Sequence, residues 1–314
     1  MTGIEWTEAT WNPVTGCDRV SPGCDHCYAL SMAARLKAMG SGKYQRDGDP
    51  RTSGPGFGVT VHPAALEIPL RWRSPRLVFV NSMSDLFHAD VPEDAVARVF
   101  AVMLAASRHT FQVLTKRPGR LRNLMRRTDF AQQVFELAVR DYGMPSERAA
   151  SSWWPLPNVW LGVSAEDQRW AEIRIPTLVD TPAACRFVSC EPLLGEVDLG
   201  RFLFPNPCPH GCGCRWPEHP EQFECACDGP CTAPEWRPVP ALGWVIVGGE
   251  SGPAARPMHP HWALNLLEQC TAAGVPFFFK QWGGRTPKQN GRVLDGQVWD
   301  QMPATVGGAA WTAV

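Results

Sequence analysis

Three cysteines close together near the N-terminus are the residues of this sequence best suited to chemistry. Cys17, Cys24 and Cys27 are spaced C-x6-C-x2-C within the turn-rich residues 16–28, directly before a predicted helix over residues 29–39. Three thiolates in one loop can hold an iron–sulfur cluster whose fourth iron keeps a non-protein ligand. They can also hold a zinc ion that a distant His or Cys completes. A third interpretation, small buried core cysteines, is disfavoured by the charged residues that flank them.

A second group of cysteines lies in residues 201–240, a polar and proline-rich segment. Such a segment cannot bury enough apolar surface to order itself, and a bound metal would supply the missing free energy. We predict a metal-binding insertion with Zn²⁺ as the first assignment; a second iron–sulfur cluster and an insert without metal are the alternatives. The six cysteines, spaced C-x3-C-x-C and then C-x-C-x3-C, are Cys208, Cys212, Cys214, Cys225, Cys227 and Cys231.

Composition and charge narrow the class of protein. The 314 residues are 44% apolar and 19% charged, which is typical of a globular enzyme and normal in length for an α/β barrel. The net charge of −1 creates no general attraction to nucleic acid or membrane. No apolar run approaches the roughly 18 residues of a membrane helix, and no signal peptide is apparent. We therefore predict a cytoplasmic protein without membrane contact, in which cysteines serve as ligands rather than in disulfides.

Six short apolar runs alternate with helical patterns, such as the one over residues 92–107, and predict the fold. Each run ends in polar or glycine-rich residues, and a seventh strand is expected just before Cys17. The pattern indicates an α/β protein with a parallel sheet, which we predict to be a partial or complete (β/α) barrel; an open doubly wound sheet is the alternative. Residues 1–200 and 241–290 would form the barrel, 201–240 the insertion and 291–314 a C-terminal tail, with 41–58 a mobile loop. The six runs are residues 76–80, 111–114, 159–163, 185–189, 244–247 and 276–279.

Catalytic groups of such barrels gather at the carboxyl ends of the strands, so the polar residues there are predicted to form one site. For each carboxylate the alternative is a solvated loop acid or a helix N-cap. Lys280, beside Gln281 and Trp282, could hold a base. The predicted catalytic residues are Asp85, Lys116 and Glu191, and the predicted cofactor-binding residues are Ser82, Ser164, Glu166, Gly248, Gly249, Glu250 and Lys280.

A basic stretch follows the second of the six runs. It is either a solvated helix face or a phosphate-binding edge for a nucleotide or nucleic acid. Its residues are Lys116, Arg117, Arg120, Arg122, Arg126 and Arg127.

The cysteine loop resembles the cluster loop of the radical S-adenosylmethionine (SAM) superfamily, whose usual spacing is C-x3-C-x2-C. Here the first gap is six residues, and His26 stands where an aromatic residue is usual. A fuller pattern resembles a phage-associated family of three-Cys-motif proteins of largely unknown function, usually grouped with radical SAM enzymes. That pattern comprises residues 11–17 (WNPVTGC), 27–28 (CY), 82–87 (SMSDLF), 114–118 (LTKRP), 190–193 (CEPL) and 248–252 (GGESG).

The resemblance implies a [4Fe-4S] cluster on Cys17, Cys24 and Cys27, SAM bound at the open iron, and release of a 5′-deoxyadenosyl radical. It also implies that residues 248–250 contact the SAM amine, and that ferredoxin or flavodoxin supplies the electron. The resulting hypothesis is a radical SAM enzyme acting on a nucleotide or nucleic acid. The alternative is a nucleic-acid-binding or partner protein that zinc or iron–sulfur stabilises, without SAM chemistry. A zinc hydrolase would need a motif such as H-E-x-x-H, which is absent from the sequence.

Overall fold

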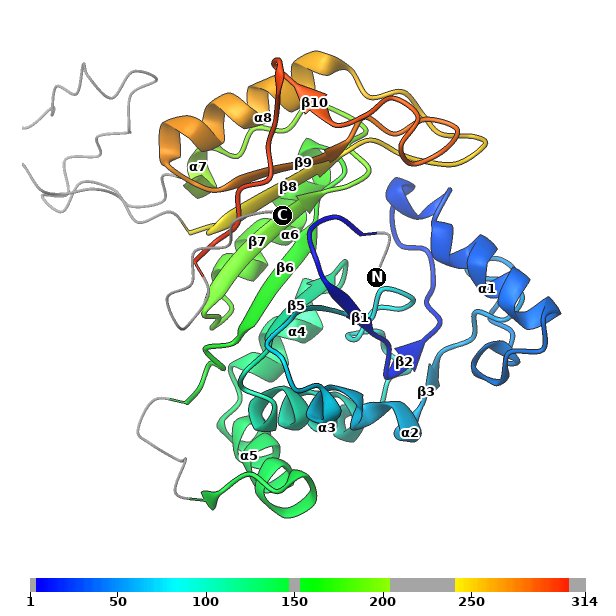
Figure 1. Ribbon diagram of the computed structural model, residues 1–314, viewed down its shortest axis with the longest axis vertical. Coiled ribbons are helices and arrows are strands. Elements are labelled where there is room, and N and C mark those ends of the chain that lie inside the picture. Colours follow the sequence, from blue (N-terminus) through cyan, green and yellow to red (C-terminus); the bar gives the residue numbers. More distant parts are fainter. Residues whose placement is uncertain (1–3, 147–152, 204–240, 305–314) are drawn as a thin grey trace, which may run out of the picture.

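The protein is built around one curled sheet of seven parallel strands. The computed structural model describes residues 4–146, 153–203 and 241–304. All neighbouring strands of the sheet are parallel and follow one another in chain order. β1 and β9 form its two edges, so the sheet is a partial rather than a complete (β/α) barrel (Figure 1). The strands are β1 (Ala9–Trp11), β4 (Leu77–Val80), β5 (Thr110–Thr115), β6 (Val159–Ser164), β7 (Cys185–Cys190), β8 (Trp244–Gly248) and β9 (Phe277–Gln281).

Six of these strands coincide with the six predicted runs to within one or two residues. The seventh, β1, lies a few residues earlier than expected, because β2 (Val14–Thr15) separates it from Cys17. β2 pairs antiparallel with β3 (Thr60–Val61) outside the large sheet. The second cysteine group, Cys208 to Cys231, lies outside the described residues.

Helices cover the outer face of the sheet, while α1 (Tyr28–Ala38) lies apart from them beside the carboxyl end (Figure 1). α3 is the most deeply buried helix, because its residues 95–104 other than Arg98 are all enclosed by the sheet and its neighbours. The helices that follow α1 are α2 (Pro63–Leu66), α3 (Glu93–Ala105), α4 (Pro118–Met125), α5 (Thr128–Tyr142), α6 (Gln168–Val179), α7 (Gly200–Leu203) and α8 (Pro260–Ala273).

The inner face of the sheet is filled by an aromatic plug at the amino-terminal half of the strands. Side chains alternate between the two faces of a strand, so Val78 and Val80 meet the helices while Leu77 and Phe79 point inward. Trp244 is the centre of the plug, with its ring 5.6–6.2 Å from those of four of the other members. The plug closes one end of the barrel and leaves the inner space open toward the carboxyl ends of the strands. It comprises Trp6, Leu77, Phe79, Trp160, Phe187, Trp244, Ile246 and Phe278.

Residues 41–58 are not the free loop that their composition suggested. Tyr44 and Phe57 are buried against α1, and the Phe57 carbonyl accepts a hydrogen bond from Cys17 N at 3.3 Å. Gly16, at φ +90°, passes so close to this segment that a Cβ would lie 2.4 Å from Gly58. The prediction of a mobile loop was wrong, because Tyr44 and Phe57 anchor the segment. The anchored segment in turn supports the cysteine loop.

The edge of β9 is covered by the chain that follows the β10–β11 hairpin (Val293–Leu294 and Gln297–Val298). Phe279 N donates to the Trp299 carbonyl at 2.8 Å, and Gln301 N donates to the Phe277 carbonyl at 3.2 Å. The described part of the predicted C-terminal tail is thus joined to the sheet.

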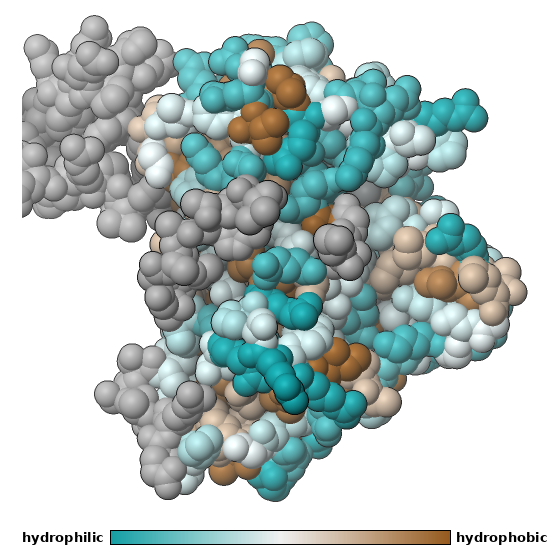
Figure 2. All heavy atoms as spheres, in the orientation of Figure 1, coloured by the Kyte–Doolittle hydropathy of each residue, from teal (hydrophilic) through white to brown (hydrophobic). Residues whose placement is uncertain are grey.

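No helix within the three described ranges is long and apolar enough to cross a bilayer. On the face in Figure 2, hydrophilic residues predominate, and apolar ones are confined to small patches.

Candidate functional site

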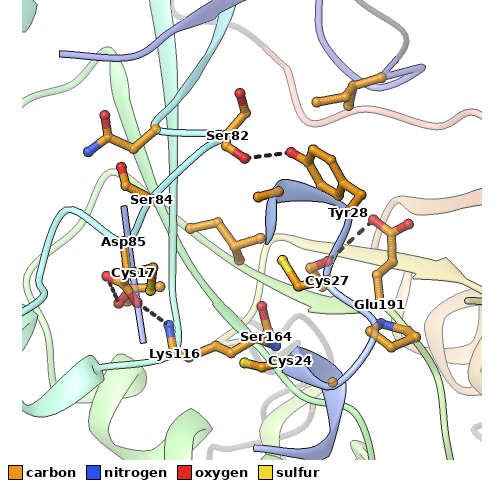
Figure 3. A pocket seen from close by; sticks show the side chains of 18 of the residues that line it. Cys17, Cys24, Cys27, Tyr28, Ser82, Ser84, Asp85, Lys116, Ser164 and Glu191 are labelled. Atoms are coloured by element: carbon orange, nitrogen blue, oxygen red, sulfur yellow. Dashed lines mark hydrogen bonds between the residues drawn. The ribbon is translucent and has the colours of Figure 1, made fainter. Parts of the chain in front are cut away.

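A cavity of about 260 Å³ lies between the carboxyl ends of the strands and the cysteine loop (Figure 3). Cys17, Cys24 and Cys27 all line it, and Trp6 and Phe79 of the aromatic plug form its floor. Segments far apart in the sequence therefore meet here, as the ends of parallel strands must. Of the ten predicted catalytic and cofactor-binding residues, eight line the cavity: Ser82, Asp85, Lys116, Ser164, Glu191, Gly249, Glu250 and Lys280.

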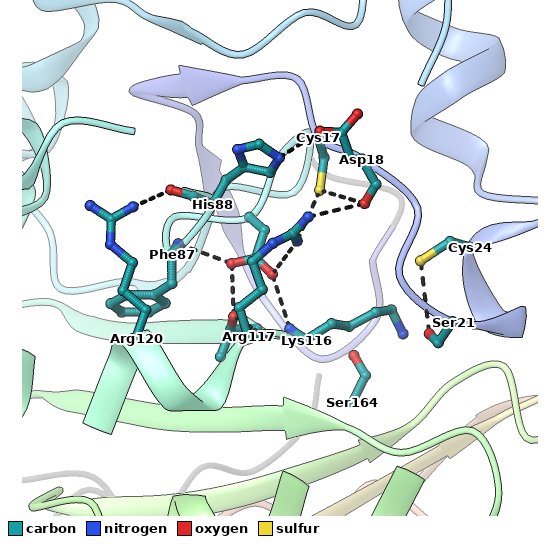
Figure 4. A network of polar contacts seen from close by, with 12 residues as sticks. Cys17, Asp18, Ser21, Cys24, Phe87, His88, Lys116, Arg117, Arg120 and Ser164 are labelled. Carbon is teal, nitrogen blue, oxygen red and sulfur yellow. Dashed lines mark hydrogen bonds and ion pairs between the residues drawn. The ribbon is translucent and has the colours of Figure 1, made fainter. Parts of the chain in front are cut away.

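Asp85, in the loop after β4, organises one side of the cavity, next to the Arg117–Cys17 contact drawn in Figure 4. Its two carboxylate oxygens accept four hydrogen bonds, of 2.7–3.1 Å, from Thr115 Oγ1, Arg117 Nη1 and the backbone nitrogens of Phe87 and Lys116. Arg117 in turn donates to Cys17 Sγ at 3.4 Å. Burial raises the pKa of Cys17 to about 12, and Asp85 adds to this while Arg117 opposes it. Asp85 thus holds the guanidinium that faces a cysteine thiol.

Glu166, after β6, lies directly behind the cavity wall and is completely buried. Oε1 accepts from Ser21 Oγ at 2.6 Å and contacts Lys116 Nζ, while Oε2 accepts from Arg174 Nη1 at 2.8 Å. Burial alone would raise the pKa of Glu166, but the charges of Lys116 and Arg174 lower it below its ordinary value. A Cβ on Gly23 would lie 2.5 Å from this carboxylate, so the cysteine loop can approach Glu166 only because it carries glycine there.

Glu250, after β8, also holds the cysteine loop. Arg256 donates to it from its backbone nitrogen and Nε at 2.9 Å and from Nη2 at 2.5 Å, and His26 Nδ1 lies 2.9 Å from Oε2. The same Nη2 donates to the Pro22 carbonyl at 2.8 Å. Burial opposes ionisation of Glu250, yet the hydrogen bonds from Arg256 and His26 outweigh it and lower its pKa from 4.5 to about 2. Both oxygens are occupied by protein groups.

This pKa shift makes a contribution to stability that depends on pH. Glu250→Gln is expected to lower the free energy of unfolding at neutral pH by about 3 kcal/mol, since each pKa unit corresponds to about 1.4 kcal/mol. Because the carboxyl is more acidic in the folded chain, its contribution is complete above the ordinary pKa and is lost as the pH falls toward 2. Urea unfolding should show a constant difference from the wild type between pH 7 and pH 5. The difference should then narrow below pH 4.5, and one that persists unchanged to pH 3 contradicts the assignment.

The glycines after β8 make room for the protein's own atoms. A Cβ on Gly248 would lie 2.5 Å from Glu191 Oε1, and one on Gly249 would lie 2.0 Å from the Trp282 carbonyl oxygen. Glu191 Oε1 itself lies 3.0 Å from Lys280 Nζ. Gly248 therefore allows the Glu191–Lys280 ion pair to form at the cavity wall, and Gly249 allows the chain after β9 to pass close by.

The basic stretch after β5 does not form a free cationic edge. Its first two members face the cavity, and Arg120 donates to the backbone carbonyls of His88 and Val91. Arg122 and Arg126 pair with Asp180, and Arg127 pairs with Glu93 and Asp129. The interpretation as a phosphate-binding edge gains no support from this arrangement.

Arg174, Arg256 and His88 lie around the site but were not selected from the sequence, and Arg117 was considered only as part of the basic stretch. His88 Nδ1 accepts from Asp90 N at 3.1 Å, so Nε2 carries the hydrogen and donates to Asp18 Oδ2 at 2.8 Å, beside Cys17. Arg174 could have been recognised from the sequence, because it is a single charged residue on the otherwise apolar face of α6. Arg117 and His88 gain their roles from partners that are distant in the sequence, whereas Arg256 pairs with Glu250, six residues away, as well as with the distant Pro22 carbonyl.

The three cysteines share one cavity but do not converge on a single point. Within the described ranges, no three Cys, His, Asp or Glu side chains converge closely enough to hold a single metal ion. Cys17, Cys24 and Cys27 nevertheless share one cavity, and a charge on Cys24 is near enough to raise the pKa of both other thiols. In an iron–sulfur cluster each thiolate binds a different iron, so the sulfurs need not meet at one point. Three thiolates around one cavity are the donor set that a cluster with one open iron would require.

Comparison with known proteins gives a family but no activity. No curated protein and no solved structure matches the chain. A family model described as "Protein of unknown function (DUF5131)" matches residues 1–303. This match spans the sheet, the cysteine loop and every lining residue of the cavity. The chain is therefore a member of the DUF5131 family.

Proposed function

We propose that the protein is an iron–sulfur enzyme of the radical SAM type. The observation that carries the proposal is the cavity itself, where three cysteines of one loop face acids and lysines from five different strand ends. The resemblance of residues 16–28 to the cluster loop of the radical SAM superfamily, and of the strand-end motifs to a three-Cys-motif family usually grouped with it, supports this chemistry over a purely structural role for the cysteines.

Cys17, Cys24 and Cys27 would hold the cluster. When bound, it would supply the electron that splits SAM into methionine and a 5′-deoxyadenosyl radical. Ferredoxin or flavodoxin is the proposed electron donor. Arg117 would stabilise the thiolate form of Cys17, because its guanidinium already donates to that sulfur at 3.4 Å. Burial keeps the pKa of Cys17 and Cys27 high in the absence of metal, and the positive charge of bound iron would oppose this effect.

The remaining polar groups would bind SAM and handle protons. Ser82, Ser164 and the backbone at Gly249 line the cavity and offer partners for the carboxylate and hydroxyl groups of SAM. The Glu191–Lys280 pair, at 3.0 Å, would hold or transfer a proton beside the substrate. We assign Glu166 and Glu250 to holding the cysteine loop instead of SAM, because protein donors occupy both of their oxygens. The aromatic plug would exclude water from the inner side.

Anaerobic reconstitution tests the proposal. The protein is incubated with iron and sulfide, then with dithionite and SAM, and 5′-deoxyadenosine is measured by chromatography. Formation of 5′-deoxyadenosine in proportion to bound iron is expected. Iron incorporation with an absorption spectrum of a cluster, but without 5′-deoxyadenosine, would contradict the enzymatic proposal and leave a structural cluster.

A further inference from the structure

We propose that the floor of the cavity is a subsite for a neutral, planar heterocycle bearing carbonyl groups, with Asn81 and Trp6 as its hydrogen-bond donors. The inference names a substrate class for the proposed enzyme. It rests on that function only for the reaction that follows, because binding at the floor requires neither cluster nor SAM.

Asn81 directly follows β4, and its side-chain donor has no partner among the described residues. Its side chain is 97% buried, it lines the cavity, and Nδ2 finds no hydrogen-bond acceptor among the described residues. Oδ1 does accept a hydrogen bond, from Val14 N at 3.4 Å. Leaving a buried donor unpaired costs about 1–3 kcal/mol. The residue also adopts φ +60°, a left-handed conformation that non-glycine residues seldom take. Such a combination in a cavity wall is explained by a ligand that supplies the acceptor.

Trp6 provides a second unpaired donor on the floor. It is 97% buried within the aromatic plug, with its ring centre 4.6 Å from that of Phe79, and its Nε1 has no acceptor in the described part of the chain. Trp11 and Trp244, which are equally buried, donate to the carbonyls of Ala65 and Gln301 at 2.8 and 2.9 Å. Trp6 thus differs from Trp11 and Trp244, whose buried indole nitrogens both have an acceptor.

The charges of the cavity indicate that the ligand group at the floor is neutral. Lys116, Arg117 and Lys280 are each paired with a carboxylate, those of Glu166, Asp85 and Glu191. What remains at the floor is apolar surface from Trp6, Phe79 and Leu114, and the two unpaired N–H donors of Asn81 and Trp6 lie just beneath this surface.

Aromatic and apolar surface of this kind favours the flat face of a ring, and the unpaired donors call for acceptors on its edge. A cavity of about 260 Å³ is slightly smaller than the range of about 300–1,000 Å³ for drug-sized ligands. This volume is that of the whole cavity, so its floor suits no more than one heterocycle, such as an oxo-purine or an oxo-pyrimidine base.

Calorimetric titration of the full-length protein without cluster, using uridine, thymidine, guanosine and inosine, tests the inference. At least one of these nucleosides is expected to bind. Asn81→Asp retains the acceptor for Val14 N and the tolerance of the left-handed conformation but removes the N–H₂ donor, and Trp6→Phe retains the ring but removes Nε1–H. Each is expected to weaken binding about tenfold, the effect of one hydrogen bond. Trp299→Phe, which removes an indole N–H that lies outside the cavity and donates to Leu294, should leave binding unchanged.

Three results would overturn the inference: no binding of any of the four nucleosides, equal affinity in both floor variants and the wild type, or loss of nucleoside binding when SAM occupies the reconstituted protein. Thermal unfolding of each variant identifies a folding defect, and Trp6→Phe carries the test if Asn81→Asp does not fold. A wild-type protein that forms 5′-deoxyadenosine but binds none of the nucleosides would retain the proposed function and lose this substrate class.

Discussion

Cys17→Ala is expected to abolish 5′-deoxyadenosine formation and to reduce iron retention after reconstitution. Cys17 is the member of the set on the Arg117 side of the cavity, and six residues of the loop separate it from Cys24. Two remaining thiols cannot hold three irons of a cluster. Because even partners outside the ligand shell change metal sites by 10–100-fold, loss of a ligand should lower product formation by more than about a hundredfold. Product and bound iron are measured on the same anaerobic sample.

Cys185→Ala is the matched control for this variant. Like Cys17, Cys185 is only partly exposed and burial raises its pKa to about 12, but it lies at the start of β7 and does not line the cavity. It should retain iron and product at the wild-type level. If Cys17→Ala formed as much product as Cys185→Ala, the assignment of the cysteine loop would be wrong.

Glu166→Gln is expected to destabilise the fold by about 3–5 kcal/mol, the usual cost of removing one partner of a buried ion pair. Both members of the Glu166–Arg174 pair are almost fully enclosed, at 0% and 1% side-chain exposure. Arg174 Nε and Nη2 already lack hydrogen-bond acceptors in the described structure, although the guanidinium lies 4.1 Å from the centre of the Trp170 ring. Without the carboxylate its charge would be left buried and uncompensated. The free energy of unfolding in urea measures the effect.

Two further variants test whether the uncompensated charge of Arg174, and not the mere substitution of a carboxylate, causes the loss of stability. The double variant Glu166→Gln/Arg174→Met removes both charges and should recover part of the lost stability. Glu268→Gln removes an exposed carboxylate of α8 and should change stability by no more than about 0.5 kcal/mol. A double variant as unstable as Glu166→Gln alone would show that the buried charge is not the cause.

The strands and the polar rim could be predicted because their signals are local. Residues 159–163, for example, form a continuous apolar run, which is typical of a strand buried on both faces, and the acid three residues later had to lie at its carboxyl end. Seven successive strands then brought Asp85, Lys116, Glu191 and Lys280 to one cavity, as expected. That the barrel is partial depends on which edges pair, and no local pattern encodes this.

The roles of individual rim residues depended on partners far away in the sequence. Glu250 was predicted to contact a cofactor, yet one of its partners, His26, lies 224 residues away. Arg117 belonged to a stretch that looked like a solvated helix face until the fold placed it beside Cys17 and Asp85. The packing of residues 41–58 could not be predicted for the same reason. Tyr44 and Phe57 are anchored by tertiary contacts with α1, which leave no local pattern in the sequence.

The strip formed by residues 299–301 keeps the edge strand β9 from pairing with the same strand of another copy of the protein. The β9 backbone groups that hydrogen-bond to this strip would otherwise be exposed to water along a strongly apolar strand (FFFKQ). An exposed edge strand of this type can pair with identical copies and lead to larger assemblies. A chain truncated after residue 290 would keep the cavity lining but expose this edge strand. Its first detectable defect would be aggregation, measured as turbidity, and not loss of activity. Shortening to residue 304 preserves the covering strip.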